Sequence, residues 1–240
     1  MNAIRCVICL MVFGVQANTI KERANILYQN NLFDEAKIII HNFLSDHPSD
    51  LEALELAGDI AIAQKNWDEA IIFFEKLVRL NPNNADFQYK YGGALGMKAL
   101  SVSRWDSLSY LGDMRKAFEK SIQLDSHHLG AYWALISYHC EVPGILGGNK
   151  KKAYKLAQVL MQMSTFDGLL AHAFLAQHEG KDKLADKLYQ EAIFSNHSKK
   201  HEEQMWLIYN QITYKNKLPF DAFLKFTKKY RPEAVAKKLT

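Results

Sequence analysis

Side chains that could bind a metal ion or act in catalysis are few, and their spacing does not bring them together. The candidates are His127-His128, His139-Cys140, His172 and His178. A zinc site needs three or four converging ligands, whereas adjacent residues in a turn or helix point in different directions. No HExxH, nucleophile-elbow or Ser–His–Asp motif is visible, and the one CxxC, Cys6 to Cys9, lies in an apolar run near the N-terminus. The sequence therefore predicts no metal site, no catalytic residue, no cofactor and no enzymatic activity.

A glycine-rich turn at residues 143–149 is a second candidate, because such turns can bind phosphate. A phosphate loop has four residues between its glycines and then Gly-Lys-Ser/Thr, and PGILGGN followed by Lys150 does not fit this pattern. Lys150, Lys151 and Lys152 would oppose the dipole of the helix that follows, and a bound anion would relieve this strain. We interpret the segment as a structural turn, in which Asn149 caps the next helix, with an anion site as the alternative.

Three carboxylates form the remaining candidate site. Glu52, Glu55 and Asp59 are three and four residues apart, so a helix places them on one face. The stripe is either a binding surface for basic groups or a solvated acidic face, and the sequence leaves both interpretations open.

The helix that carries this stripe belongs to a segment of two amphipathic helices, residues 51–84. Small and large apolar residues recur there with helical spacing: Leu54, Ala57, Gly58 and Ala61, then Ala70, Phe74 and Leu77. Pro82 cannot continue a helix and is expected to end the second one.

The same pattern recurs along the chain at a fixed interval. Three features recur after thirty-four residues. Phe33-Asp34-Glu35-Ala36 recurs as Trp67-Asp68-Glu69-Ala70, Pro48 recurs as Pro82, and the small residue Ala24 recurs as Gly58. We assign repeats to 18–50, 51–84, 85–126, 127–164 and 165–198, with a degenerate, basic cap at 199–240. The third repeat holds about ten extra residues around 101–111, which we expect to lengthen its two helices. Its second helix is predicted over Asp113 to Leu124.

A 34-residue helix pair with these proline, small and aromatic positions resembles the tetratricopeptide repeat. The resemblance implies an all-α, right-handed α-solenoid of about five to six hairpins, in which the first helix of each pair lines a concave groove. It implies a non-enzymatic scaffold that binds a protein or peptide. Residues 85–163 resemble a subgroup of bacterial exported tetratricopeptide-repeat proteins that have a P-G-x-x-G-G turn inside one repeat. The resemblance lies in the segment FEKSIQLD, the helix after it, and the segment PGILGGNKKKA that follows that helix. That subgroup implies no defined activity.

The resemblance also implies which side chains point into the groove. The second, fifth and ninth positions of the first helices are expected to point into the groove, and we take seven of the residues there as candidate binding residues: Glu52, Glu55, Asp59, Asp86, Tyr89, Trp133 and Ser137. This groove would be acidic near the N-terminus and aromatic further along, which suits an extended peptide with basic and apolar side chains. A known clamp for a C-terminal carboxylate is not expected. Lys21 and Asn25 match the lysine and asparagine that the clamp has on its first helix. However, Leu56 stands where the clamp needs asparagine, and Asp86 stands where it needs lysine.

The first seventeen residues have the order of a secretory signal peptide. Arg5 precedes an apolar run from Cys6 to Val15, and Val15-Gln16-Ala17 is a small-x-small cleavage site. A membrane anchor or a buried helix is the alternative. We expect cleavage after Ala17, a periplasmic or secreted solenoid domain at residues 18–240, and no integral membrane span after cleavage.

Charge and composition narrow the partner classes. Hydrophobic residues make up 48% of the sequence, which is normal for a folded protein. The formal net charge of +4 is too small to indicate a nucleic-acid partner. The main prediction is therefore an envelope scaffold with a protein or peptide in its groove. The alternative is a structural subunit of a larger envelope assembly that binds through its ends or convex face. An enzyme or ligand-binding protein built around the insert, with a pocket lined by Trp105, Tyr110 and His139, is a third hypothesis.

Overall fold

The computed structural model describes residues 19–195, and this part of the chain is helical, with no β-strand in it. The all-α prediction is confirmed. The described residues belong to two compact units that divide after Ala134, within α7. The predicted signal peptide at 1–17 and the predicted cap at 199–240 lie outside the described residues.

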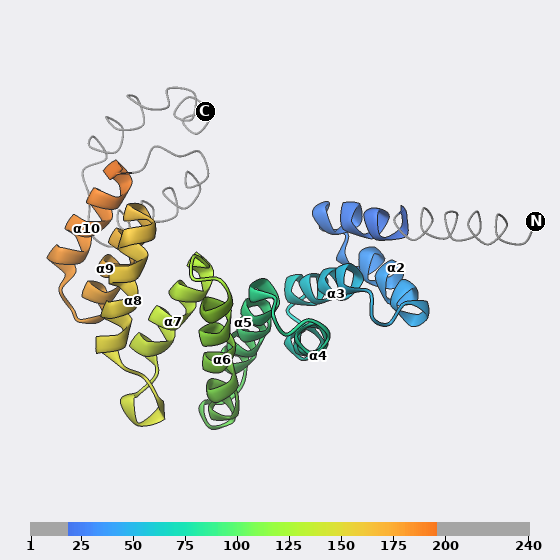
Figure 1. Cartoon of the computed structure of the whole chain (residues 1–240), viewed down its shortest axis with the longest axis horizontal. Helices are drawn as coiled ribbons and strands as arrows, with labels where there is room; N and C mark the ends of the chain where they lie inside the picture. Colours follow the sequence, from blue (N-terminus) through green and yellow to red (C-terminus); the bar gives the residue numbers. More distant parts are fainter. Residues whose placement is uncertain (1–18, 196–240) are drawn as a thin grey trace, which may run out of the picture. The chain divides into compact units, whose positions relative to one another are not determined.

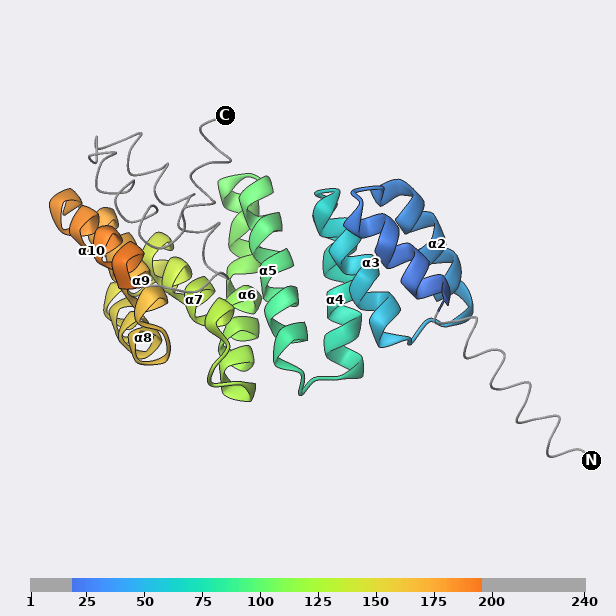
Figure 2. The ribbon, with the colours of Figure 1, turned by 90° about the horizontal axis from the view of Figure 1, so that it is seen from above.

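Consecutive helices of the first unit run back and forth along the chain (Figures 1 and 2). They are a helix over residues 19–29, α2 (Phe33–Asp46), α3 (Leu51–Ala63), α4 (Trp67–Leu80), α5 (Ala85–Ser101) and α6 (Arg104–Leu124). From α2 to α6, each helix packs against the next. Short polar connections between them make antiparallel hairpins.

Side-chain caps and prolines fix where these helices begin and end. The backbone N–H of Ala53 donates to Asp50 Oδ1 at 2.9 Å, and that of Phe87 donates to Asn84 Oδ1 at 3.1 Å, at the starts of α3 and α5. Helices α2 and α4 end two residues before Pro48 and Pro82. The predicted helix ends at these two prolines are therefore confirmed.

The small residues of the repeat allow the helices of one pair to touch. A Cβ atom added to Gly58 would lie 2.3 Å from Phe74 Cε1, and one added to Gly92 would lie 2.8 Å from Phe118 Cε1. The same glycine–phenylalanine contact thus occurs in two successive repeats. The two glycines are 34 residues apart and the two phenylalanines 44 residues apart, so the ten extra residues of the third repeat lie inside its hairpin.

These extra residues are helical. Helix α5 has 17 residues and α6 has 21, against 13 and 14 for α3 and α4. The expected lengthening is confirmed, but the expected start of the second helix at Asp113 is wrong. Helix α6 begins at Arg104, because the Ser103 hydroxyl accepts a hydrogen bond from the Asp106 N–H at 3.3 Å and caps the helix there.

The second unit contains the end of α7 (Leu129–Glu141), a 3₁₀ turn (Gly144–Leu146), α8 (Lys150–Met163), α9 (Thr165–His178) and α10 (Asp182–Ser195). Helix α9 packs against both α8 and α10. The predicted cap on α8 is confirmed, since the Lys152 N–H donates to Asn149 Oδ1 at 3.1 Å. Only Ser164 separates α8 from α9, and a Cβ on Gly168 would lie 2.2 Å from Met161 Cα.

We expect Gly168→Ala to destabilise the second unit by about 3 kcal/mol, because a methyl group at this position collides with backbone that cannot rotate away. Urea unfolding followed by far-UV circular dichroism measures the effect. Gly112→Ala is the matched control: its Cβ would enter open space on α6, so the helix propensity of alanine should stabilise by up to about 1 kcal/mol. Equal stability of Gly168→Ala and the wild type would contradict the close α8–α9 packing.

Candidate functional site

The first unit contains a groove of about 600 Å³ between the helix over residues 19–29 and α3. Its wall on the first helix is formed by Lys21, Glu22, Asn25, Tyr28 and Gln29. Its wall on α3 is formed by Glu52, Glu55, Leu56 and Asp59. The acidic stripe predicted on α3 therefore lies in a groove, and residues from the preceding repeat complete it.

The 34-residue interval explains why these two sets of side chains meet. Lys21 and Asn25 precede Glu55 and Asp59 by one repeat length, so they occupy equivalent positions on the first helices of consecutive repeats. When such helices pack in the same register, equivalent positions line the same surface. Lys21 and Asn25 were absent from the predicted groove residues. The fifth and ninth helix positions, which identify Glu55 and Asp59 in the second repeat, identify Lys21 and Asn25 when they are applied to the first repeat.

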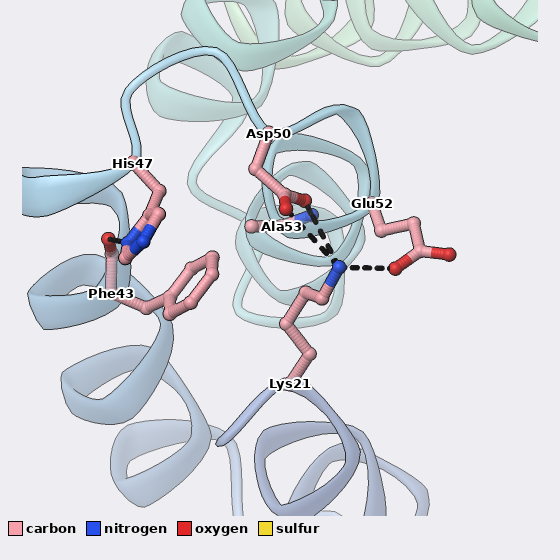
Figure 3. A network of polar contacts seen from close by, with 6 residues as sticks. All are labelled: Lys21, Phe43, His47, Asp50, Glu52 and Ala53. Carbon is pink, nitrogen blue, oxygen red and sulfur yellow. Dashed lines mark hydrogen bonds and ion pairs between the residues drawn. The ribbon is translucent and has the colours of Figure 1, made fainter. Parts of the chain in front are cut away.

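Lys21 joins the two walls at one end of the groove. Figure 3 shows its ammonium group between the carboxylates of Asp50 and Glu52. The Lys21 Nζ to Asp50 Oδ2 distance is 3.1 Å, and Nζ also donates to Glu52 Oε2. Burial lowers the pKa of Lys21, but the hydrogen bonds to Glu52 and Asp50 outweigh burial and raise it above its ordinary value. Lys21 is therefore a fixed positive charge at neutral pH.

Lys90 of α5 neutralises part of the acidic stripe. Its ammonium group lies 2.6 Å from Asp59 Oδ2 and 2.7 Å from Glu55 Oε1. Burial lowers the pKa of Lys90, yet its hydrogen bonds to Asp59 and Glu55 raise it overall. Burial raises the pKa of Asp59, and the contact with Lys90 offsets part of this shift. The two carboxylates are thus held in place by a partly buried cation from the next repeat.

The groove keeps an excess of negative charge after this pairing. Four carboxylates, those of Glu22, Glu52, Glu55 and Asp59, face two ammonium groups, those of Lys21 and Lys90. Glu22 and Glu52 are exposed to solvent. A cationic side chain entering the groove would therefore meet carboxylates that are already positioned, which lowers the ordering cost of binding.

The Lys90 contacts predict a loss of stability at alkaline pH. The folded pKa of Lys90 is raised above its ordinary value of 10.5, so its contribution is complete below pH 10.5 and is lost as the pH rises through the folded pKa. Unfolding midpoints in urea between pH 8 and pH 12 should decline less steeply for Lys90→Met than for the wild type. Lys155→Met, at an exposed position on α8, is the control. Equally steep declines in all three proteins would contradict the assignment.

Asp86 and Tyr89 lie in a different cluster, around His128. The Ala131 N–H donates to His128 Nδ1 at 3.0 Å, and His128 Nε2 lies 3.1 Å from Asp86 Oδ1. This arrangement assigns the proton to Nε2, which donates to Asp86. The Tyr89 ring centroid is 4.7 Å from that of His128. His128 thus caps the start of α7 and supports Tyr89, and these contacts account for His128 without a metal ion.

The other two predicted binding residues lie on α7 and do not line the groove of the first unit. Trp133 is half-buried, and the Ser137 hydroxyl donates to Glu141 Oε1 at 3.1 Å. Their roles, like those of Asp86 and Tyr89, stay predictions. Within residues 19–195, no group of three or more His, Cys, Asp and Glu side chains could hold a metal ion. In the same part of the chain, every helix is too short or too polar to cross a membrane.

Comparisons with known proteins relate part of the sequence to a repeat family and the structure to a repeat fold, while the individual repeat boundaries stay a prediction. Residues 21–94 match the tetratricopeptide repeat family, whereas no curated protein matches the sequence. A thermophilic TPR protein of Thermus thermophilus, TTC0263, has a similar structure, with a TM-score of 0.59 and 14% identity over 88% of this chain and 97% of that one. A MamA structure gives a TM-score of 0.56 and 18% identity, covering 71% of this chain and 92% of MamA.

A third similar structure is YrrB, described as a TPR protein with an unusual peptide-binding site. Its TM-score is 0.52 at 16% identity, covering 72% of this chain and 83% of YrrB. At these identities the likeness extends to the fold alone, and the P-G-x-x-G-G subgroup stays a prediction. Residues 21–94 therefore carry tetratricopeptide repeats, and the chain has the all-α fold of a tetratricopeptide-repeat solenoid.

Proposed function

We propose that the protein is a non-enzymatic scaffold of the cell envelope that binds an extended, basic peptide segment in the groove between the helix over residues 19–29 and α3. One observation carries the proposal: two consecutive repeats build a single groove of about 600 Å³ with an excess of carboxylates. The tetratricopeptide-repeat fold supports a protein or peptide partner, since arrays of this kind present extended binding surfaces.

The chemistry of the groove suits a peptide with alternating side-chain types. Exposed Glu22 and Glu52 would contact lysine or arginine side chains of the ligand, and Asn25 would hydrogen-bond its backbone. Tyr28 and Leu56 offer apolar and aromatic surface in the same groove. Lys21 and Lys90 hold Glu52, Glu55 and Asp59 in place, so the binding surface is preorganised.

The envelope location rests on the sequence at residues 1–17. An apolar run of ten residues, Cys6 to Val15, and a small-x-small site before Asn18 support export and cleavage after Ala17. N-terminal sequencing of the protein purified from its native cell tests this part directly. A sequence that starts at Asn18 is expected, and an intact Met1 would contradict it.

Reversing the two exposed groove charges should abolish most of the binding with little effect on the fold. Glu52 pairs with Lys21, but its side chain is 78% exposed and Asp50 still pairs with Lys21 after the substitution. We expect Glu22→Lys with Glu52→Lys to weaken binding of a cationic peptide selected from a displayed library by at least about tenfold, because four units of charge change beside the ligand. Isothermal titration calorimetry measures the affinity. Glu35→Lys with Glu75→Lys makes the same charge change at exposed sites on α2 and α4. Equal losses in both variants would point to non-specific charge effects and contradict the groove.

A structural role in a larger assembly is the second candidate, and exposed apolar side chains favour it. Leu100 and Trp105, at the end of the long α5–α6 hairpin, are 78% and 83% exposed. Large apolar groups left in water at one place commonly mark an interaction surface. Light scattering distinguishes the two roles: a stable oligomer that Trp105→Ser dissociates would support assembly through this hairpin.

A further inference from the structure

The turn between α7 and α8 holds an apolar side chain in solvent. Ile145 is 95% exposed and its neighbour Leu146 is 37% exposed, in the loop that leads from α7 into α8 in Figure 1. The loop is well organised. Leu146 N–H donates to Pro143 O at 2.8 Å, Gly148 N–H donates to the same oxygen at 3.2 Å, and the Tyr138 hydroxyl donates to Leu146 O at 3.2 Å.

Two glycines are needed for this conformation. Gly147 has a φ of +105°, in the left-handed region that disfavours side chains. A Cβ atom on Gly148 would lie 1.6 Å from Val142 O, so the backbone could not keep this path with any other residue there. The sequence P-G-I-L-G-G thus specifies a fixed turn with isoleucine at its exposed position. No contact within the described residues explains why that position is apolar.

A cluster of unpaired cations follows the turn directly. Lys150, Lys151 and Lys152 are all exposed, and none of them forms an ion pair with another described residue. Glu179, whose charge interacts with Lys150, already pairs with Lys181 at 2.7 Å. Within residues 141–152, three lysines stand against one acidic side chain, Glu141, a net charge of +2. The lysines do not stabilise α8, because cations in a first helical turn oppose the helix dipole.

We propose that this surface, residues 143–152, docks the protein on an anionic lipid bilayer. Ile145 and Leu146 would enter the headgroup region, while Lys150, Lys151 and Lys152 would contact lipid phosphates, as in other peripheral membrane segments that combine apolar and basic residues. Two apolar side chains are too few for a stable protein interface, which needs about 800 Å² per partner. Weak, reversible membrane contact needs only a short apolar insertion and attraction of nearby lysines. The proposal does not depend on peptide binding in the groove.

Vesicle co-sedimentation tests the proposal. The protein is expressed from its complete coding sequence, so that any processing of residues 1–17 takes place, and is mixed with vesicles of phosphatidylcholine and phosphatidylglycerol at 7:3. We expect binding that falls with added salt and is absent from pure phosphatidylcholine. Ile145→Ser should weaken it about tenfold, from the lost apolar insertion. Replacing the three lysines with glutamine should weaken it about a hundredfold, at roughly fivefold for each charge.

Matched variants keep the result unambiguous. Ile72→Ser removes an equally large exposed isoleucine from α4 and should leave vesicle binding unchanged. Ile145→Ser should keep the wild-type circular dichroism spectrum and peptide affinity, because its side chain packs on nothing. Failure of the wild type to bind anionic vesicles would overturn the proposal. So would unchanged binding by Ile145→Ser, or a loss caused only by Trp105→Ser, which would place the contact on the α5–α6 hairpin.

Discussion

Replacing Phe74 with alanine is expected to lower the unfolding free energy of the first unit by about 4 kcal/mol. Phe74 is 1% exposed, its ring fills the space that Gly58 leaves on α3, and the Lys90 ammonium group lies 5.8 Å from the ring centroid. The side chain therefore contacts both α3, which carries the acidic wall of the groove, and the lysine that orders it. Its removal leaves a cavity beneath these elements.

Urea unfolding of Phe74→Ala, with Ile72→Ala as an exposed control on the same helix, measures this effect. The control should change the stability by less than about 0.5 kcal/mol. A double-mutant cycle gives a sharper test. Gly58→Ala should be strongly destabilising in the wild type, because its methyl group overlaps the ring, and nearly neutral in Phe74→Ala. Additive effects of the two substitutions would show that the ring does not occupy the space beside Gly58.

The second large effect is expected from reversing Glu55 and Asp59 together. The sequence alone suggests Glu55→Lys with Asp59→Lys as a change that removes partner binding and leaves the fold intact. The structure argues against this expectation, because both carboxylates bond to Lys90. Three lysines would then meet around a partly buried site, and we expect a loss of about 3 kcal/mol, since removing the partners of a desolvated charge is strongly destabilising.

Adding Lys90→Glu to this double variant restores opposite charges and should recover about half of the lost stability. Urea unfolding of the double and triple variants at pH 7 measures the recovery. If the triple variant is no more stable than the double, the Lys90 ion pairs do not stabilise the fold. Binding studies on the groove should therefore use Glu22 and Glu52, whose exposed side chains can be reversed with less structural effect.

Much of the fold could be predicted from the sequence because it depends on local signals repeated at a fixed interval. Pro48 and Pro82 mark helix ends, Asn149 marks a helix start, and Gly58 marks a close helix contact opposite Phe74. Each acts within one hairpin, so its effect can be inferred from residue type and spacing. The Ile38-Ile39-Ile40 run is helical because the repeat places Ile40 in the core, and this packing overrides its preference for strands.

The groove was predicted in part, because its charges depend on contacts between repeats. Glu52, Glu55 and Asp59 follow from the helical face that they share. The pairing of Lys90 with two of them depends on the register of α5 against α3, which the composition of either helix does not reveal. Likewise, the start of α6 at Arg104 depends on one serine cap, and the role of His128 depends on the backbone N–H of Ala131.

Photo-crosslinking in the native cell tests most directly whether this groove holds a partner. Benzoylphenylalanine is placed at Asn25, in the groove, or at Ile72, exposed on α4, and the adducts are identified by mass spectrometry. We expect an adduct from Asn25 to a partner segment rich in lysine or arginine, and its loss when Glu22→Lys and Glu52→Lys are added. Adducts from Ile72 but not from Asn25, or an Asn25 adduct that survives the charge reversal, would contradict it.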